Sequence, residues 1–171
     1  MTQKITLRVL LAATALFSLG QTVRAADAAQ TRVSVTFENP EKFTDLKDSQ
    51  FGTDKGRDHY LKLLRTVAEE EGNRLLPAGQ KLALTFHDID LAGDYLPSMP
   101  ANRDIRVMKD IFAPRMKLSF TITDAAGAVV KEGSDTVSDM NYLNNISIVG
   151  RSEELYYDRT MLRDWLRRTL K

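Results

Sequence analysis

The densest group of side chains that could do chemistry in this 171-residue chain is His87 with Asp88, Asp90 and Asp94. One imidazole and three carboxylates within eight residues could supply metal ligands, and the carboxylates alone could serve as general acid and general base. On a regular strand, however, His87 and Asp88 would point to opposite faces of the sheet. We therefore predict no metal site here, and we expect no cofactor.

Other catalytic motifs are missing from the sequence. There is no cysteine, no glycine-rich phosphate loop and no serine-nucleophile motif. The second histidine, His59, falls in the first turn of a predicted helix, where we expect it to be solvated. An acidic loop departs from the spacing of a calcium-binding loop, so we expect a solvated loop; its acids are Asp45, Asp48, Asp54 and Asp58. We predict no catalytic residue.

The clearest structural element is a strand over residues 115–124. Its apolar side chains alternate with polar ones, which is typical of a strand with one buried face; they are Met116, Leu118, Phe120 and Ile122. Residues 124–127 predict a turn, and residues 128–138 predict the partner strand, with a bulge at Gly133.

Residues 81–91 predict a second strand that contains an irregularity. Its apolar positions change phase at His87–Asp88, so that Ile89 follows a different alternation from Phe86. Because a one-residue shift turns every later side chain to the other face, we predict a β-bulge or a strand end at this point.

Two segments have the periodicity of helices. Residues 57–76 carry an apolar stripe that includes Leu64 and Val67, and residues 152–170 carry a second one, with Ser152 as the predicted N-cap. We expect Trp165, the single tryptophan, to anchor the second helix in the core.

These elements, with a first strand at 32–37 and a short strand at 104–108, predict an α+β fold. We expect an antiparallel sheet of about four to five strands with two helices packed on one face.

The first 25 residues predict a secretory signal peptide. Lys4 and Arg8 precede an apolar run over residues 9–19, and small residues lead to a cleavage site after Ala25. The alternative, an anchor that stays in the membrane, is disfavoured because a span needs about 20 apolar residues. We therefore expect a cleaved, exported product without a stable membrane anchor, which forms a single α+β domain over residues 26–171.

The charge of that product argues against a nucleic-acid partner. Removal of residues 1–25 leaves 21 Lys and Arg against 23 Asp and Glu, a net charge of −2. A nearly neutral chain gives no general electrostatic attraction to nucleic acid. An exported chain without cysteine must be held together by packing, which suits a bacterial periplasm.

The segment from Asp90 to Arg115 is the predicted working surface. It lacks a clear burial pattern, and loops of this length are uncommon in compact domains unless they are functional or disordered. Aromatic and arginine side chains, which interfaces favour, stand here among apolar ones. We predict contact with an envelope protein or a cell-wall component through Tyr95, Arg103, Arg106 and Lys109.

An alternative for the three cations of this segment is that they solvate an edge strand. In both cases we expect that replacing Arg103, Arg106 and Lys109 by Ser leaves the melting temperature nearly unchanged.

Four stretches of the chain resemble the domain of unknown function 3016 family, which consists of small exported proteins of Gram-negative bacteria. They are LPAGQ at 76–80, DIDLAG at 88–93, DIRVMKDIFAPRMKLSF at 104–120 and LRDWLRRTL at 162–170. The resemblance extends over essentially the whole mature chain and implies a bacterial, periplasmic protein. The family has no assigned activity, so no catalytic residue can be transferred from it.

Two hypotheses for the function follow. The first is a non-enzymatic binding or envelope-assembly module. The second is a hydrolase of envelope material that uses Asp88, Asp90 or Asp94 as acid and base. A deep cleft that gathers two carboxylates would favour the hydrolase, and a flat apolar patch would favour the binding module.

Overall fold

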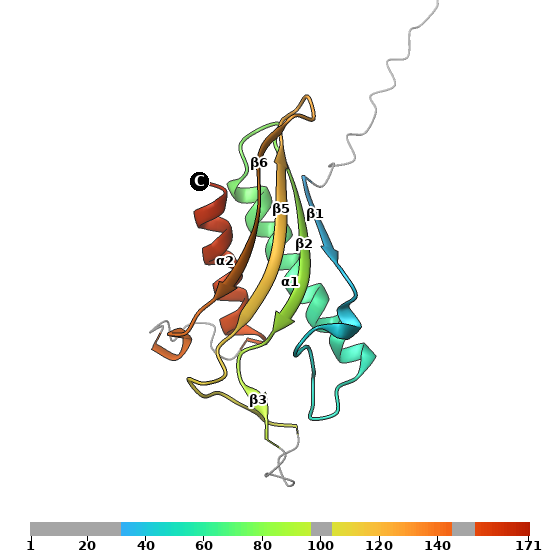
Figure 1. Cartoon of the computed structure of the whole chain (residues 1–171), viewed down its shortest axis with the longest axis vertical. Helices are drawn as coiled ribbons and strands as arrows, with labels where there is room; N and C mark the ends of the chain where they lie inside the picture. The colour runs from blue at the N-terminus through green and yellow to red at the C-terminus, as the bar shows by residue number, and fades with distance from the viewer. Residues whose placement is uncertain (1–31, 97–103, 145–152) are drawn as a thin grey trace, which may run out of the picture. The chain divides into compact units, whose positions relative to one another are not determined.

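The structure is a computed structural model that describes residues 32–96, 104–144 and 153–171. Its largest element is a four-stranded sheet. All of these residues belong to one unit, residues 31–171. The strands lie in the order β1-β2-β5-β6 (Figure 1); their bounds are Val33–Phe37, Lys81–Asp90, Arg115–Thr123 and Val129–Ser138. The predicted signal peptide, Arg103 and Ser152 lie outside the described residues.

The sheet is mixed, so the expectation of a wholly antiparallel sheet is wrong for one strand. The pairs β2–β5 and β5–β6 are antiparallel, but β1 runs parallel to β2, with Val33 opposite Leu82. The chain between them contains α1 (Asp54–Leu75), because parallel neighbours need a long crossover connection. The α+β class is confirmed.

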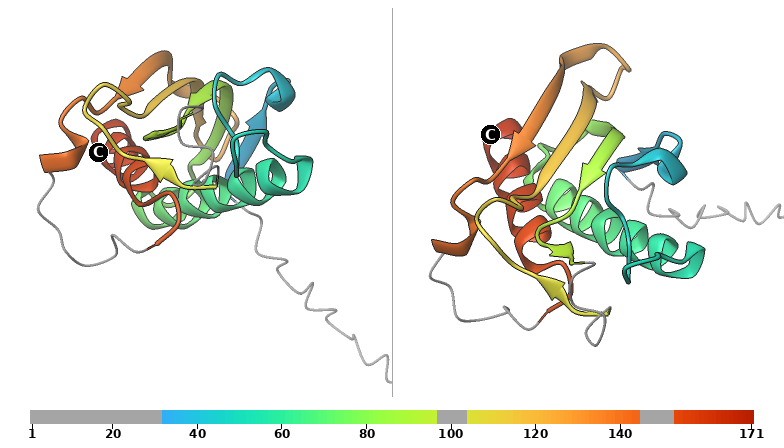
Figure 2. Two further views of the ribbon diagram at one scale, coloured as in Figure 1. Left: turned by 90° about the horizontal axis from the view of Figure 1, so that it is seen from below. Right: turned by 60° about the horizontal axis from the view of Figure 1, so that its bottom comes forward.

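Both helices lie on the same face of the sheet, as predicted (Figures 1 and 2). Alternate residues of β1, β2 and β5 are buried on that face, including the predicted positions of β5. Trp165 of α2 (Tyr156–Thr169) is 4% exposed, and its ring meets the Phe120 ring edge-on at 5.5 Å between centroids. The register of β5 and the role of Trp165 as a core anchor are confirmed.

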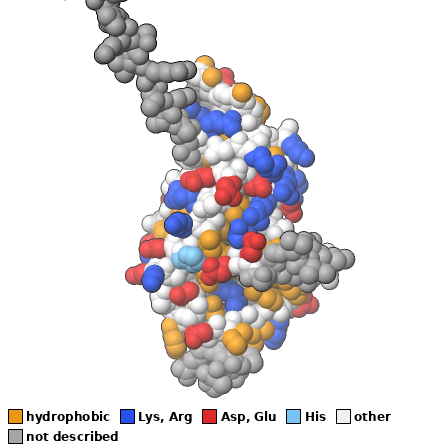
Figure 3. Space-filling view, turned by 180° about the vertical axis from the view of Figure 1, so that it is seen from behind, with side chains coloured by type: hydrophobic (Ala, Val, Ile, Leu, Met, Phe, Trp, Pro, Cys, Tyr) orange, Lys and Arg blue, Asp and Glu red, His pale blue; other side chains and the backbone are white. Residues whose placement is uncertain are grey.

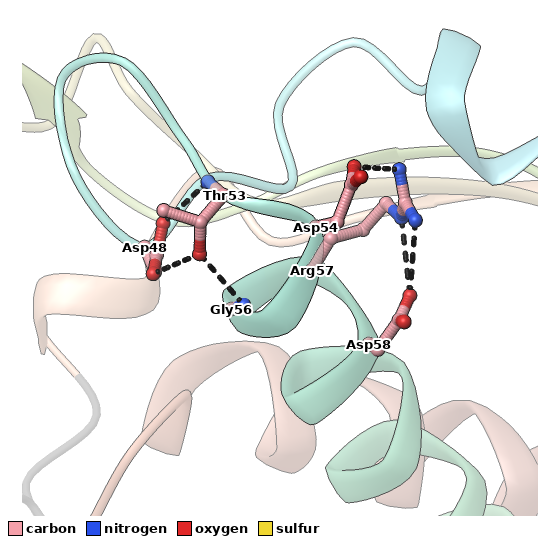
Figure 4. Close-up of polar contacts among 6 residues, drawn as sticks. All are labelled: Asp48, Thr53, Asp54, Gly56, Arg57 and Asp58. Atoms are coloured by element: carbon pink, nitrogen blue, oxygen red, sulfur yellow. Dashed lines mark hydrogen bonds and ion pairs between the residues drawn. The ribbon is translucent and has the colours of Figure 1, made fainter.

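The start of α1 explains most of the acidic loop (Figure 4). The Thr53 hydroxyl oxygen accepts a hydrogen bond from the Gly56 N–H at 2.9 Å, which is the usual capping interaction. Asp48 in turn accepts bonds from the Thr53 N–H and hydroxyl at 2.9 and 2.8 Å. The helix therefore begins at Asp54, three residues before the predicted start.

Two more acids of this loop pair with an arginine on the first turn of the helix. The Arg57 guanidinium lies 2.9 Å from Asp54 and 3.1 Å from Asp58 (Figure 4). These carboxylates thus serve the helix start. The expectation of a solvated loop is wrong for Asp45, which is only 9% exposed.

The predicted bulge at Gly133 is wrong. The register of β5 and β6 shifts between Ile122 and Thr123, whereas Gly133 pairs regularly with Phe120. A Cβ atom on Gly133 would lie 3.1 Å from Cε1 of Phe120, so the glycine makes room for the aromatic ring.

The face of β6 toward the helices carries two charged side chains. Asp135 accepts a hydrogen bond from Trp165 Nε1 at 2.8 Å, and Lys131 Nζ donates one to the Thr169 carbonyl at 2.8 Å. The edge strand is therefore fastened to α2 largely by polar contacts.

The last helix begins at Tyr156, four residues later than predicted. The preceding residue, Leu155, has a left-handed backbone with φ of 52°, which a helix cannot continue through.

The segment Asp90–Arg115 forms a separate pair of short antiparallel strands, β3 (Asp94–Tyr95) and β4 (Arg106–Val107). Among the described residues, no helix combines the length and the apolar character needed to cross a membrane.

Gly72→Ala is expected to lower the stability although alanine is the better helix former. Gly72 packs α1 against β1, and an added Cβ would lie 2.6 Å from Cγ2 of Val33, whose side chain is 1% exposed. We expect a loss of about 1–3 kcal/mol from this overpacking, against a gain of about 1 kcal/mol in helix propensity. Urea unfolding of the variant measures the difference.

The neighbouring substitution Asn73→Ala provides the control, because Asn73 is exposed on the same helix. It should be neutral or slightly stabilising. A Gly72→Ala variant that is more stable than the wild type would contradict the close contact.

Candidate functional site

His87 lies at a β-bulge, as predicted. Phe86 pairs with Leu118 and Asp88 pairs with Lys117, so His87 is the additional residue of β2. The shift keeps Ile89 in the core, where it is fully buried, and turns Asp88 toward the open face of the sheet.

The partners of His87 are structural. Its Nδ1 lies 2.7 Å from the Glu38 carboxylate and its Nε2 lies 2.8 Å from the Ser119 hydroxyl. These contacts connect β2 to the end of β1 and to β5. In the described part of the chain, no three His, Cys, Asp or Glu side chains are arranged to hold a metal ion.

Asp88 also acts as a connector. Its carboxylate accepts hydrogen bonds from the Thr44 N–H and hydroxyl at 2.8 and 2.9 Å and lies 3.6 Å from Lys117. Burial alone would raise the pKa of Asp88, but the bonds from Thr44 and the charge of Lys117 bring that pKa below its ordinary value.

The carboxylates of Asp90 and Asp94 line a cavity together with Asp45. This acidic cavity has a volume of about 250 Å³, and residues 111–113 form part of its wall. Burial raises the pKa of Asp90, and the charge of Asp45 raises it further. The four residues that lie close together in the sequence are therefore separated in the structure. Asp90 and Asp94 line this cavity, whereas His87 and Asp88 do not.

Arg106 is the residue around which the Asp90–Arg115 segment is organised. Its Nη1 lies 2.8 Å from the Asp45 carboxylate and donates to the Gly93 carbonyl at 2.8 Å, and its Nη2 donates to the Lys47 carbonyl at 2.9 Å. Its guanidinium carbon lies 4.7 Å from the centre of the Tyr95 ring. Only 10% of the Arg106 side chain is exposed, contrary to the expectation that it can be replaced without loss of stability.

The Arg106–Asp45 ion pair connects the acidic cavity to a second cavity of about 200 Å³. Asp45 lines the first cavity and Arg106 lines the second. We call the second one the tyrosine cavity, and it is walled by Tyr60, Ala92, Tyr95, Arg106, Met108 and residues 153–158. Burial raises the pKa of Tyr60 to about 12, so its hydroxyl stays neutral.

Asp158 is the buried acid of the tyrosine cavity. It is 2% exposed, and its Oδ1 accepts a hydrogen bond from the Ala92 N–H at 2.9 Å. Burial raises the pKa of Asp158 to about 7, although the bond from Ala92 and the charge of Arg106 oppose the rise.

The sequence prediction missed Asp158, but a signal for it exists. Asp158 stands four residues before Leu162 and eight before Leu166, on the same side of the helix, and all three are buried. A charged residue in line with such an apolar stripe indicates a buried polar interaction.

Asp158→Asn is expected to reduce the pH dependence of stability. Between pH 4 and 7 the folded protein holds a proton on Asp158 that the unfolded chain has released, so the free energy of unfolding falls as the pH rises through this range. The contribution is on the order of 4 kcal/mol at most. Urea unfolding at pH 5 and pH 8 should show a smaller difference for the variant than for the wild type.

An equal pH dependence of the two proteins would contradict the raised pKa. Asn keeps a carbonyl oxygen that can accept the bond from Ala92, so the comparison tests the charge rather than the hydrogen bond.

The four predicted contact residues have different environments. Tyr95, which is 8% exposed, and Arg106 both line the tyrosine cavity. Lys109 has an exposed side chain, and its carbonyl accepts a hydrogen bond from the Tyr142 hydroxyl at 2.7 Å. Arg103 lies outside the described residues.

Comparison with known protein families identifies the class of this protein. The family described as "Protein of unknown function (DUF3016)" matches residues 31–168, and the chain belongs to this family. The resemblance seen in the sequence is thereby confirmed. No curated protein and no solved structure matches the chain.

Proposed function

We propose that this protein is a periplasmic binding or envelope-assembly module, and that the tyrosine cavity is the centre of its contact surface. The observation that carries the proposal is the buried Arg106, which fastens the Asp90–Arg115 segment so that it closes one side of a cavity with tyrosine walls. Tyr95 and Arg106 line the cavity; Arg103 and Lys109 belong to the proposed contact surface on the sequence prediction alone. Tyrosine and arginine are enriched among the residues that contribute most of the binding energy in protein–protein interfaces.

An envelope partner is supported by the sequence layout and by the surface charge. The 25-residue export signal expected from the sequence would direct the chain to the periplasm, which supports a partner in the envelope. Figure 3 shows basic and acidic side chains interspersed over the face that the helices cover, without the continuous basic surface typical of nucleic-acid binding.

Export is expected to leave a chain that starts at Ala26. The mass of the intact protein from a periplasmic extract should equal that of residues 26–171. A mass that includes residues 1–25 would contradict cleavage of the signal peptide.

The contact surface can be tested with a photo-crosslinking amino acid. Met108 lines the tyrosine cavity and is 40% exposed, so a crosslinker at this position is expected to capture an envelope component in living cells. The control position is Ala83, which is exposed on the open face of the sheet. The same adducts at both positions, or none at position 108, would contradict the proposal.

A hydrolase is the second candidate, and one observation favours it. The pKa of Asp90 is raised and the pKa of Asp88 is lowered, and this divergence is what an acid–base pair of carboxylates requires. Asp90 also lines the acidic cavity with Asp94. Asp90 would act on envelope material that enters this cavity.

Release of soluble fragments from purified cell-wall sacculi tests the hydrolase. If it is correct, the wild type releases fragments and Asp90→Asn releases at least tenfold fewer. The control is Asp164→Asn on the outer side of α2, which should leave the release unchanged. No release by the wild type would rule this candidate out for cell-wall substrates.

A further inference from the structure

We infer that the tyrosine cavity binds a primary ammonium group, such as the end of a lysine side chain that a partner presents. This inference rests on the proposed function, because it specifies the ligand of the same cavity. Three features support it: the charges of the lining, the aromatic walls and the size of the cavity.

The lining carries more negative than positive groups. Arg106 is its one cation and already pairs with Asp45 outside the cavity at 2.8 Å. The three acids of the lining are Glu153, Glu154 and Asp158. A cation that enters therefore meets an excess of carboxylates.

Two of these acids have partners outside the cavity, and the third does not. Glu153 lies 3.0 Å from Arg159, and Glu154 lies 2.7 Å from His59, which is a cation only when protonated. Asp158, although 2% exposed, forms no ion pair with any residue that the structure describes. A buried acid of this kind is stabilised as a carboxylate when a cation is placed beside it.

The walls of the cavity are aromatic faces and edges. Tyr156 and Tyr157 are in edge contact at 5.2 Å between ring centres, and Tyr60 and Tyr95 complete the wall. Cations bind over such rings, and Arg106 already does so over Tyr95 at 4.7 Å. Tyrosine rings with carboxylates favour an organic cation over an anion.

The size of the cavity limits the ligand to one group. Its volume is about 200 Å³, which is below the range of about 300–1,000 Å³ common for complete small-molecule ligands. A single side chain fits this space better than a whole metabolite. An extended alkyl ammonium has the apolar stem for the rings and the charge for Asp158.

Binding of an ammonium group should depend on pH through Asp158. Its pKa of about 7 means that the carboxylate needed for the pair forms between pH 6 and 8. The charged and titratable groups around it come from the other elements of the site; they are Arg106, Asp45, Tyr60, Tyr95, Tyr142, Glu154 and, behind Glu154, His59.

The test is a calorimetric titration of the mature protein with N-acetyl-lysine N-methylamide. Its comparison ligand is the norleucine derivative, which has a hydrogen atom in place of the ammonium group. We expect the lysine derivative to bind at least tenfold more tightly at pH 8, and roughly tenfold more weakly at pH 6 than at pH 8. Equal affinity of the two derivatives would overturn the inference.

A third ligand, 1,5-diaminopentane, identifies the source of the ammonium group. Weaker binding than that of the lysine derivative assigns the ligand to a polypeptide, and tighter binding assigns it to a free amine. If no amine binds while the crosslinks at position 108 persist, the ammonium inference is wrong and the proposed function stands.

Variants separate charge from folding. Asp158→Asn should weaken binding of the lysine derivative at least tenfold at pH 8 and greatly reduce the pH dependence. Glu154→Gln, at a position with a side chain that is 58% exposed, tests the rim without disturbing the core. Asp164→Asn is the control, because Asp164 pairs with Arg167 on the same helix and does not line the cavity. Unchanged affinity in both Asp158→Asn and Glu154→Gln would overturn the inference.

Discussion

Replacing Phe120 by Asp is expected to abolish stable folding. Phe120 is 7% exposed in the middle of β5, its ring meets Trp165 at 5.5 Å, and Gly133 leaves room for it on the next strand. An unpaired carboxylate at such a position costs several kcal/mol, a large part of a typical stability of about 5–15 kcal/mol. Thermal melts followed by circular dichroism should lose their cooperative transition.

Thr121→Asp is the matched control, one residue further along the same strand. Its side chain is half-buried on the open face of the sheet, opposite Glu132 of β6. We expect a cost of at most about 1 kcal/mol, which arises from the two like charges on neighbouring strands. A lower melting temperature for Thr121→Asp than for Phe120→Asp would show that the strand register is wrong.

Arg106→Ser is expected to lower the free energy of unfolding by about 3–5 kcal/mol. The substitution leaves the carboxylate of Asp45, whose side chain is 12% exposed, without its cation. It also removes donors from the carbonyls of Gly93 and Lys47. Urea unfolding at pH 7 measures the loss.

Lys109→Ser controls for removal of a positive charge from the same segment. The Lys109 side chain is exposed, so we expect a change within about 0.5 kcal/mol. Equal stability of the Arg106 and Lys109 variants would contradict the structural role of Arg106. Because of that role, a triple replacement of Arg103, Arg106 and Lys109 tests folding and binding together, and single variants are preferable.

The parts of the fold that could be predicted depend on local periodicity. The alternation of β5 and the phase change at His87–Asp88 are properties of neighbouring residues, so the buried face and the bulge follow from the sequence alone. The apolar stripe of α2 that contains Trp165 is also a pattern of neighbouring residues, so it too follows from the sequence. The parallel pairing of β1 with β2 is not local, because it depends on where a 22-residue helix returns the chain.

The candidate site could be predicted only in part, because its contacts join distant segments. Arg106 meets Asp45 across 61 residues, and Asp158 meets Ala92 across 66 residues. Composition indicated that Tyr95 and Arg106 were unusual, but not that they would be buried. His87 and Asp88 are neighbours in the sequence, which suggested a shared catalytic or metal site. In the structure the bulge directs the two side chains to different partners, Glu38 and Thr44.

The polar attachment of β6 to α2 has a consequence for the order of folding and for self-association. An edge strand with apolar residues on its inner face could join the sheet early and then recruit a strand from another molecule. Lys131 and Asp135 oppose this, since both are exposed charged residues of the edge strand that bond to Thr169 and Trp165 of the last helix. These two contacts can form only once α2 has docked, so the attachment of β6 to the helices is completed only when the C-terminal helix is in place.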